Sequence, residues 1–439
     1  MFRLISDLFI NKENTGRHLR TILKTMMKLQ DEHMLHIKDA FNKMKSKEDF
    51  LAILNSTKKL IYGEKCVPFE LKQLNYHSNQ KVNPKRYIQF KIKKKSGSDR
   101  TIHAPNKGLK AIQKCLNLIF QVIYDVSPSA YGFVPQKSIV DNARVHTGSL
   151  YVYNIDLKDF FPSIDRSRVW GRLKVAPFNL NEKNESTELA DIIASLCCQE
   201  MEVERLDENG EWKKTTKNVL PQGAPTSPTL TNIICQQLDF YLNAVAKRFG
   251  LKYSRYADDI TFSSMNDVYG EKSEIKNKKG NNFYNELRLI IKEQKFQINE
   301  AKTRLQRNEF RQEVTGLIVN EKVNVPQRYI KQLRMWLYYW ESYGYEKAST
   351  YFLPQYIADK GHTKKGKPNM ENVISGKLDY LRMVKGSKNS LYLKLKERFD
   401  KLAGDINPIT EILDIWEKDG IEKAMETYYN SKSKQDNHE

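Results

Sequence analysis

The sequence feature that most constrains this chain is a pair of adjacent aspartates, Asp258 and Asp259, at the centre of Tyr253–Phe262. Residues that favour β-strands flank a short Ala-Asp-Asp core, which predicts a β-hairpin with both carboxylates at its turn. Two neighbouring carboxylates repel each other, and this repulsion costs free energy unless a cation lies between them. Mg²⁺ is the natural candidate, because this hard ion binds one or two carboxylates together with substrate phosphates. Aspartates are also frequent in solvated turns, so the pair alone leaves both interpretations open.

A third carboxylate, Asp156, ends a second predicted strand that begins at Tyr151. An aromatic pair follows it, and Pro162 then predicts the start of a helix. If both strands deliver their acids to one edge of a sheet, Asp156 and the aspartate pair could hold two metal ions about 3.5–4 Å apart. This arrangement suits in-line phosphoryl transfer, because it stabilises both the attacking and the leaving oxygens. Asp159 and Phe160 are equally well explained as a turn cap and a core residue.

A loop rich in proline, Leu220–Pro228, lies between these carboxylates and leads into a predicted helix at about 229–248. The loop backbone can approach a ligand closely, and Gln222 adds an amide that donates and accepts hydrogen bonds. Ahead of the loop, the runs 203–206 and 212–216 flank turn residues and predict a surface hairpin.

Nearer the N-terminus, two β-like runs within 87–105 flank a basic turn rich in glycine and serine, which predicts another hairpin. Its tip could close over phosphates, or it could be a solvated turn.

Residues 1–75 are predicted to be helical, because apolar residues recur at helical spacing. That spacing is set by Ile22, Met26 and Leu29.

The charge balance points to the class of partner. The 439 residues include 73 Lys and Arg against 53 Asp and Glu, a net charge of +20, which favours a polyanionic partner such as nucleic acid. The five cysteines lack Cys-x-x-Cys spacing, so they predict reduced core residues of a cytoplasmic protein rather than disulfides or a zinc site. Since the sequence contains no apolar run of transmembrane length and no visible secretory signal, no membrane partner is expected.

Four motifs, taken in order, resemble the palm motifs of bacterial reverse transcriptases. They are Asp156 with Phe161, then Leu220–Gly223, then Tyr256–Asp259, and finally Asn299–Thr303. The resemblance covers about residues 85–325. It implies an α+β right-hand polymerase with a ferredoxin-like palm, fingers and an α-helical thumb.

The resemblance implies that Asp156, Asp258 and Asp259 bind two Mg²⁺ ions. Lys302 would protonate pyrophosphate as it leaves, although a surface lysine explains this residue equally well without the resemblance.

The resemblance also implies three contacts with the incoming nucleotide. Arg100 would contact the triphosphate, and Gln222 would contact the nucleotide and the template. Phe161 would block a ribose 2′-OH, so that dNTPs are preferred over ribonucleotides.

Two further signatures resemble the retron branch of this family. An Asn-Ala-x-x-His pattern contains Asn142 and His146, and a Val-Thr-Gly motif contains Thr315 and Gly316. They imply that these four residues help to recognise a structured RNA. A structural explanation remains open for each, because His146 could be a satisfied core histidine and residues 314–319 could be an ordinary strand with a glycine bulge.

The composition changes after Pro326, where Ile330, Leu333, Leu337 and Trp340 fall on one helical stripe. A core-packed helix explains this stripe, and the resemblance assigns it to the thumb. A basic loop follows, and then further helices, the last at about 410–428, and a polar tail. The predicted regions are a helical N-terminal region at 1–85, fingers and palm at 86–325, a helical thumb at 326–405, and a C-terminal helix with a polar tail at 406–439.

These expectations combine into one functional prediction. The chain would be an RNA-directed DNA polymerase that uses dNTPs and Mg²⁺ to copy a dedicated structured non-coding RNA, which serves as template and primer. Retron-type priming from an internal 2′-OH would give a branched RNA–DNA product with an RNA–DNA duplex, in anti-phage defence beside an effector protein.

Three alternatives remain open at this point. The additional C-terminal helices are compatible with a defence-associated reverse transcriptase of another branch. A group II intron maturase-type enzyme is disfavoured, because no Cys-rich or His-Asn-His tail follows the thumb. A non-catalytic RNA-binding scaffold is disfavoured, because every expected catalytic acid is present.

Overall fold

The computed structural model describes residues 31–93, 99–180, 186–206, 211–269, 282–360 and 368–403, and the single positions 415, 423 and 425. The chain divides into two compact units, Met1–Val323 and Asn324–Glu439. Several predicted features lie outside the described residues. These are the helical stripe at 22–29, the hairpin tip at 94–98, most of the basic loop at 359–368, and the last helix and tail beyond 410.

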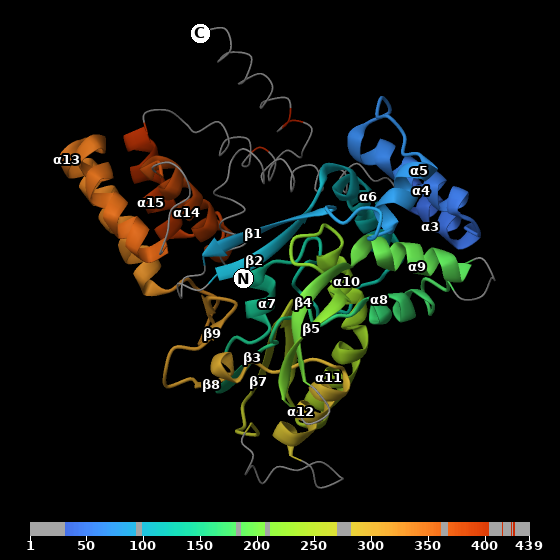
Figure 1. Cartoon of the computed structure of the whole chain (residues 1–439). Coiled ribbons are helices and arrows are strands. Elements are labelled where there is room, and N and C mark those ends of the chain that lie inside the picture. Colours follow the sequence, from blue (N-terminus) through green and yellow to red (C-terminus); the bar gives the residue numbers. More distant parts are fainter. Residues whose placement is uncertain are drawn as a thin grey trace, which may run out of the picture. The chain divides into compact units, whose positions relative to one another are not determined.

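A four-stranded sheet forms the centre of the N-terminal unit (Figure 1). Its strands, in the spatial order β6-β7-β3-β8, are β6 (Lys252–Tyr256), β7 (Asp259–Ser264), β3 (Tyr151–Asp156) and β8 (Arg304–Arg307). Every neighbouring pair is antiparallel. Helical segments connect β3 to β6 and β7 to β8, while β6 and β7 form a hairpin, which is the ferredoxin-like arrangement. The predicted α+β polymerase fold is therefore confirmed.

Two helices pack on this sheet, α11 (Gln236–Arg248) and α12 (Phe283–Glu293). Phe283 packs edge-on against Phe262 of β7, with the ring centroids 5.0 Å apart. Burying a phenylalanine side chain stabilises the fold by about 1.5–3 kcal/mol. The strands that end in carboxylates therefore rest on a closely packed aromatic core.

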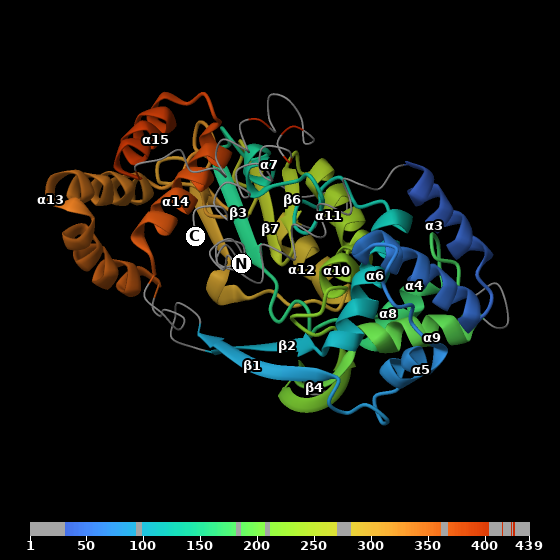
Figure 2. The ribbon, with the colours of Figure 1, turned by 90° about the horizontal axis from the view of Figure 1, so that it is seen from above.

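The N-terminal helices pack around α6 (Lys107–Ile123), as Figure 2 shows. They are α3 (Asp31–Lys43) and α4 (Lys47–Tyr62), and α5 (Leu71–Ser78) packs in turn on α4. The predicted hairpin that follows is confirmed as β1 (Tyr87–Lys93) and β2 (Asp99–Pro105).

The predicted surface hairpin is also confirmed, and it is longer than the sequence suggests. Strands β4 (Gln199–Leu206) and β5 (Trp212–Val219) pair over their whole lengths. Two helices precede it, α8 (Arg166–Leu173) and α9 (Ser186–Cys197). In both ribbon views the hairpin lies beside β1 and β2 (Figure 1 and Figure 2).

Two helix boundaries differ from the predictions. Pro162 lies in a turn, and α8 begins only at Arg166, because the chain first bends around the residues after Asp156. The single helix predicted at about 229–248 is two helices, α10 (Ser227–Ile234) and α11, interrupted at Cys235, where ψ is 2°.

The Val-Thr-Gly segment is not a strand with a bulge. Short strands β9 (Glu313–Val314) and β10 (Leu317–Ile318) form a hairpin of their own. Thr315 and Gly316 join them with φ values of +47° and +81°. Two successive residues of positive φ produce a tight turn between antiparallel strands.

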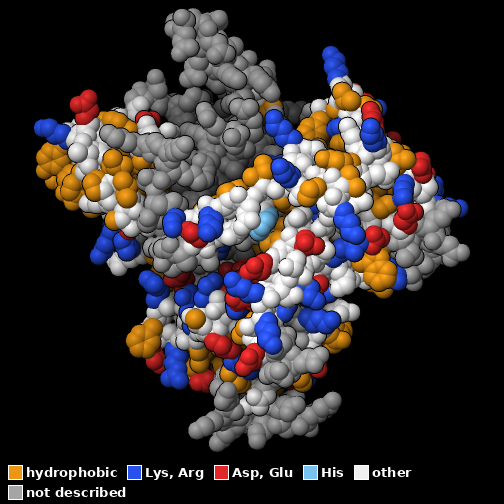
Figure 3. Space-filling view, viewed as in Figure 1, with side chains coloured by type: hydrophobic (Ala, Val, Ile, Leu, Met, Phe, Trp, Pro, Cys, Tyr) orange, Lys and Arg blue, Asp and Glu red, His pale blue; other side chains and the backbone are white. Residues whose placement is uncertain are grey.

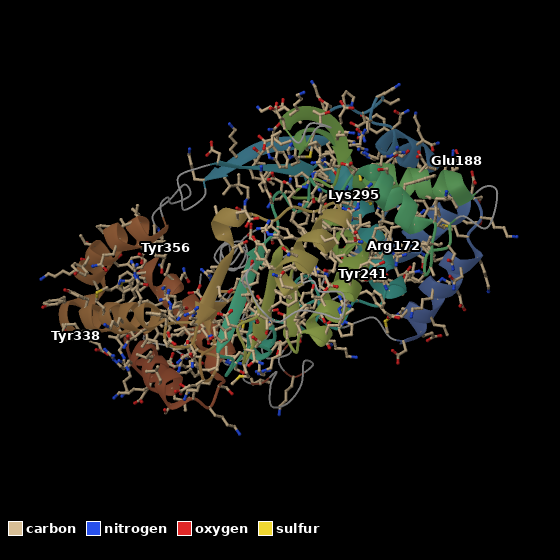
Figure 4. The ribbon with its side chains drawn as sticks, turned by 90° about the horizontal axis from the view of Figure 1, so that it is seen from below. Arg172, Glu188, Tyr241, Lys295, Tyr338 and Tyr356 are labelled. Atoms are coloured by element: carbon tan, nitrogen blue, oxygen red, sulfur yellow. The ribbon has the colours of Figure 1, made fainter. Side chains whose placement is uncertain are left out.

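The C-terminal unit is a bundle of α13 (Gln327–Lys360), α14 (Met370–Lys385) and α15 (Ser390–Ala403). The predicted apolar stripe is confirmed as core, since Leu333, Leu337 and Trp340 are buried. Side chains of α13 differ in exposure: Tyr356 is buried, whereas Tyr338 is exposed, and Figure 4 labels both.

The described residues bear on two further expectations. All five cysteines are free thiols, and only Cys66 is not buried. In the part of the chain that the structure describes, no helix combines the length and apolar character needed to cross a membrane.

Candidate active site

The three predicted acids meet at one edge of the central sheet. Asp156, the last residue of β3, is the cross-strand partner of Asp259 at the start of β7. The turn between β6 and β7 places Asp258 next to them, and its carbonyl accepts a hydrogen bond of 3.0 Å from the Leu157 N–H. Ala257 adopts a φ of +57° in this turn, which makes the reversal tight.

The aspartate pair lies in an environment that opposes its charge. Burial, together with the nearby Asp156 carboxylate, raises the pKa of Asp258 to about 6. Burial and the charges of Asp258 and Asp156 raise the pKa of Asp259 to about 7. Among the described residues, no group hydrogen-bonds the buried Oδ1 of Asp258. The surroundings of this pair therefore favour its protonated form when no cation is bound.

Asp156 is better supplied with partners than the other two acids. The Lys302 Nζ lies 3.0 and 2.9 Å from its two carboxylate oxygens. Asn299 donates from its side chain to Oδ1 at 2.9 Å and from its backbone to the Asp156 carbonyl at 2.8 Å. Lys302 ends the short 3-10 helix η1 (Glu300–Lys302), so the Asn299–Thr303 motif contacts the first catalytic strand directly.

The donor set fits a hard divalent cation, because it consists of carboxylate oxygens and includes one buried oxygen with no partner among the described residues. Within the described ranges, no group of three His, Cys, Asp or Glu side chains is arranged to hold a metal ion. Reverse transcriptases in general use divalent metal ions.

A buried ion pair connects the β6–β7 hairpin to helix α11. Arg255, three residues before Asp258, donates two hydrogen bonds of 2.7 Å to the two carboxylate oxygens of Asp239 on α11. Its guanidinium also donates to the Asn232 side chain at 3.1 Å and to the Ala257 carbonyl at 3.3 Å. Burial opposes the charge of Arg255, but the adjacent Asp239 carboxylate raises the pKa of the guanidinium well above its ordinary value.

Sequence reasoning missed this network. Its members come from separate elements, and Arg255 lies in a strand that also contains Lys252 and Ser254, so the sequence gives no clear signal that Arg255 is buried. Gly132 belongs to the same region, since a Cβ there would lie 2.5 Å from the Ala257 nitrogen. The turn that carries Asp258 is therefore in close contact with its support.

The predicted nucleotide-contacting residues lie on two adjoining elements. The Gln222 carbonyl accepts a hydrogen bond of 2.9 Å from the His103 N–H of β2. Gly223 has a φ of +128°, and a Cβ on it would lie 2.6 Å from the His103 carbonyl oxygen, so a glycine is required there. Arg100 is three residues earlier on β2 and is half-buried.

The two phenylalanines after Asp156 differ in exposure. Phe160 is 3% exposed and packs on Phe296, with centroids 5.8 Å apart. Phe161 is half-buried and contacts the rings of Phe160 and Phe133 at 5.7 and 6.0 Å. Phe161 is therefore the member of the pair that retains a partly accessible ring.

The structure brings the two retron signatures together through a contact between Asn142 and Thr315. Asn142 on α7 (Ile139–Arg144) donates to the Thr315 hydroxyl at 3.5 Å. His146 is fully buried, with its ring nitrogens 2.7 and 2.8 Å from the hydroxyls of Ser254 and Ser263. Burial lowers the pKa of His146 to about 3.

The side chains of Asn142 and His146 are buried within the protein, as the structural explanation for His146 expects, and their part in recognising RNA stays a prediction. Thr315 and Gly316 are half-buried at the tip of the β9–β10 hairpin.

Basic side chains are scattered over the face drawn in Figure 3, and acidic side chains lie among them.

Comparisons with known proteins agree with this geometry. Residues 92–329 match the family described as reverse transcriptase (RNA-dependent DNA polymerase), which is more than half of the 439 residues. The chain is 36% identical over 258 residues to Retron Mx162 reverse transcriptase of Myxococcus xanthus, covering 56% of this chain and 51% of that protein. It is 33% identical over 255 residues to Retron Ec86 reverse transcriptase of Escherichia coli, covering 57% and 68%.

The chain thus spans about half to two thirds of the length of these curated relatives. Among solved structures, a telomerase from Candida albicans aligns with 80% of this chain and 71% of its own at 10% identity and a TM-score of 0.35, a likeness too remote to support an inference. The matched family and the retron relatives show that this chain belongs to the reverse transcriptase family and, within it, to the retron-type enzymes.

Proposed function

We propose that this protein is an RNA-directed DNA polymerase of the retron type. The observation that carries the proposal is the meeting of Asp156, Asp258 and Asp259 at one sheet edge, where the last two have raised pKa values. Closely spaced, poorly paired carboxylates cost free energy in the folded protein, and a bound cation removes that cost.

In this proposal the three aspartates hold Mg²⁺. When bound, the ions would align the attacking hydroxyl with the α-phosphate and neutralise charge on the triphosphate. Lys302, which already reaches Asp156, would donate a proton to the departing pyrophosphate. Its side chain is 60% exposed, so it is accessible to a substrate.

Three residues would select the nucleotide. Arg100 would contact the triphosphate, and Gln222 would contact the nucleotide from a loop whose backbone is fixed on β2. Phe161 would exclude a ribose 2′-OH by steric clash. The partial exposure of Phe161, in contrast to the burial of Phe160, supports this assignment.

The template and primer would be a dedicated structured non-coding RNA, primed from an internal 2′-OH to give a branched RNA–DNA product. Anti-phage defence with an effector protein would be the biological context. The supporting observation is the similarity to retron reverse transcriptases. Asn142 would act indirectly, by holding the Thr315–Gly316 turn in place for contact with RNA.

Primer extension on an RNA template tests the polymerase proposal. Asp258→Asn with Asp259→Asn should lower extension by about a thousandfold or more, since metal binding stabilises the transition state by several kcal/mol. Glu202→Gln is the matched control, because it removes a carboxylate that pairs with Lys214 at 3.1 Å on the surface of β4–β5. Extension by the double variant within about tenfold of the wild type would refute the metal assignment.

Sequencing the nucleic acid that copurifies with the protein tests the retron proposal separately. The expected product is DNA joined to an RNA through a 2′–5′ linkage that a debranching enzyme cleaves. Active extension of an ordinary annealed primer without any such product would leave the polymerase in place and refute the retron priming mode.

A further inference from the structure

The β4–β5 hairpin packs along the turn that carries Phe161. This turn, residues 157–165, is called the Phe161 turn below. At the base of the hairpin, the Leu220 N–H donates a hydrogen bond of 3.0 Å to the Ile164 carbonyl, and Asp165 forms a β-bridge with Val219. The end of the turn is therefore joined to the hairpin by backbone contacts.

Side chains nearer the tip of the hairpin hold the rest of the turn. Arg205 of β4 donates hydrogen bonds to the Pro162 carbonyl at 2.6 Å and to the Asp165 carboxylate at 2.7 Å. A second connection joins Lys158 to the hairpin, through the Glu204 carboxylate at 3.2 Å and the Trp212 ring at 4.2 Å.

Arg205 holds two residues that follow Phe161 in the turn, Pro162 and Asp165. Pro162 is the next residue after Phe161, so the guanidinium fixes the backbone directly beside the ring. Hydrogen bonds in which one partner is charged are shorter and stronger than neutral ones. The Arg205 side chain is 26% exposed, so solvent screens this interaction only in part.

The Phe161 turn contains one residue in a costly backbone conformation. Asp159 has a φ of +45°, a left-handed conformation that residues other than glycine adopt at a cost. Inside the turn, the Ser163 N–H donates to the Asp159 carbonyl at 2.8 Å and the Ile164 N–H donates to the Phe161 carbonyl at 3.1 Å, and both are backbone contacts that do not touch the Phe161 ring. The ring itself contacts only two other aromatic rings in the described residues, those of Phe160 and Phe133.

A ring that excludes a 2′-OH discriminates by clash, and a clash is effective only if the ring cannot move aside. Displacements of about 1 Å at a reacting centre are enough to change rates by large factors. A contact that fixes the backbone beside Phe161 should therefore influence sugar selection more than it influences the chemical step.

We propose that Arg205 is a specificity-determining positioning residue, and that the β4–β5 hairpin sets the preference for dNTPs over ribonucleotides by fixing the Phe161 turn. The proposal rests on the proposed function of Phe161 as the residue that excludes the 2′-OH. Arg205 acts through Phe161 and does not itself contact the substrate.

The experiment measures kcat/KM for a dNTP and for the matching ribonucleotide on one RNA template. Arg205→Met keeps the length of the side chain but removes its donors, and it should lower the ratio of dNTP to ribonucleotide kcat/KM about tenfold while kcat for the dNTP stays within about threefold. Arg205→Lys, which keeps a charged donor but not the two-pronged geometry, should restore part of the ratio. Lys214→Met is the matched control, since it removes a cation from the same hairpin whose partner is Glu202.

Phe161→Ala in the same assay separates the two proposals. If Phe161→Ala leaves the ratio unchanged, the assignment of Phe161 itself fails. If Phe161→Ala lowers the ratio but Arg205→Met does not, or if Arg205→Met slows both nucleotides equally, the inference about Arg205 is overturned. The double variant should discriminate no worse than Phe161→Ala alone, because both changes act on one ring. Thermal unfolding of each variant confirms folding, and a folded Arg205→Lys with restored selectivity keeps the test decisive if Arg205→Met is unstable.

Discussion

Two groups of charged residues include positions of the β6–β7 hairpin that are at most four residues apart, and they differ in how the protein pairs their charges. Arg255 and Asp239 are buried and form a two-pronged ion pair, with Tyr253 donating a further hydrogen bond of 2.7 Å to the carboxylate. Asp258 and Asp259, at the turn, have raised pKa values, and the buried Oδ1 of Asp258 has no partner among the described residues.

This difference in pairing distinguishes residues that stabilise the fold, called the scaffold below, from residues of the candidate active site, called the site. A buried charge destabilises a protein unless it is paired, so a stable scaffold supplies partners, as it does for Arg255. The turn three residues later carries two acids with raised pKa values, and among the described residues the Oδ1 of Asp258 has no hydrogen-bond partner. Asp258 and Asp259 therefore carry negative charge that the nearby protein groups do not fully balance, at the end of a strand whose own arginine is fully paired. A site that binds an external cation requires such an imbalance.

The largest expected effect is on the scaffold. Asp239→Ala should lower the free energy of unfolding by roughly 3–5 kcal/mol, because it leaves Arg255 buried without its counter-charge. Urea denaturation followed by circular dichroism measures this change. A loss below about 1 kcal/mol would mean that the pair is not the support that its burial indicates.

A double variant sharpens this result. Asp239→Leu with Arg255→Met replaces both charges by apolar groups of similar size, and it should recover part of the lost stability. Primer extension by the double variant should remain impaired, because the contact between Arg255 and the Ala257 carbonyl is absent. Full recovery of both properties would show that the network has no role in placing the catalytic turn.

The next effect, of opposite sign, is at the site. Asp258→Asn with Asp259→Asn should raise the free energy of unfolding of the metal-free protein at pH 8 by roughly 1–3 kcal/mol, because it removes two charges that the fold disfavours. A carboxyl whose pKa is higher in the folded than in the unfolded chain binds more protons when folded, between the two pKa values. Wild-type stability should therefore fall as the pH rises from about 4 to about 7, which spans the shift from 3.8 to about 6 and about 7.

Denaturation at pH 5 and pH 8 in the presence of a chelator measures this effect, and the double variant should lack that part of the pH dependence. Adding Mg²⁺ should stabilise the wild type and not the variant. Equal stability of the two proteins at pH 8 without metal would contradict the comparison between scaffold and site.

The sequence predicted the positions of the three aspartates at strand ends, because the strand or hairpin that carries each one can be recognised from its neighbouring residues. A carboxylate at the end of an apolar strand is visible in the chain itself, and so is the hairpin around Asp258. The family resemblance supplied their order, and the sheet pairing of Asp156 with Asp259 places them together. The role of each side chain remains a prediction.

The support for the acids could not be predicted in the same way. Asp239 lies on a helix, and only the packing of α11 against β6 brings it to Arg255. Motifs also carried no information on burial. The motif that contains Asn142 and His146 did not show that both side chains occupy the interior, where the His146 ring nitrogens lie within hydrogen-bond distance of two serine hydroxyls from neighbouring strands.

The smallest expected effect on stability concerns Lys302, which stands between scaffold and site. It pairs with Asp156, as scaffold residues do, but its side chain is 60% exposed. Exposed ion pairs contribute little, so Lys302→Gln should change the free energy of unfolding by less than about 1 kcal/mol. Primer extension should nevertheless fall by roughly a hundredfold or more if Lys302 protonates pyrophosphate.

Arg288→Gln is the matched control, since it removes an ion pair of 2.6 Å with Glu300 on the same short helix and should leave both properties close to wild type. A Lys302 variant that lost as much stability as Asp239→Ala would belong to the scaffold, whereas one that extended primers normally would be a surface lysine.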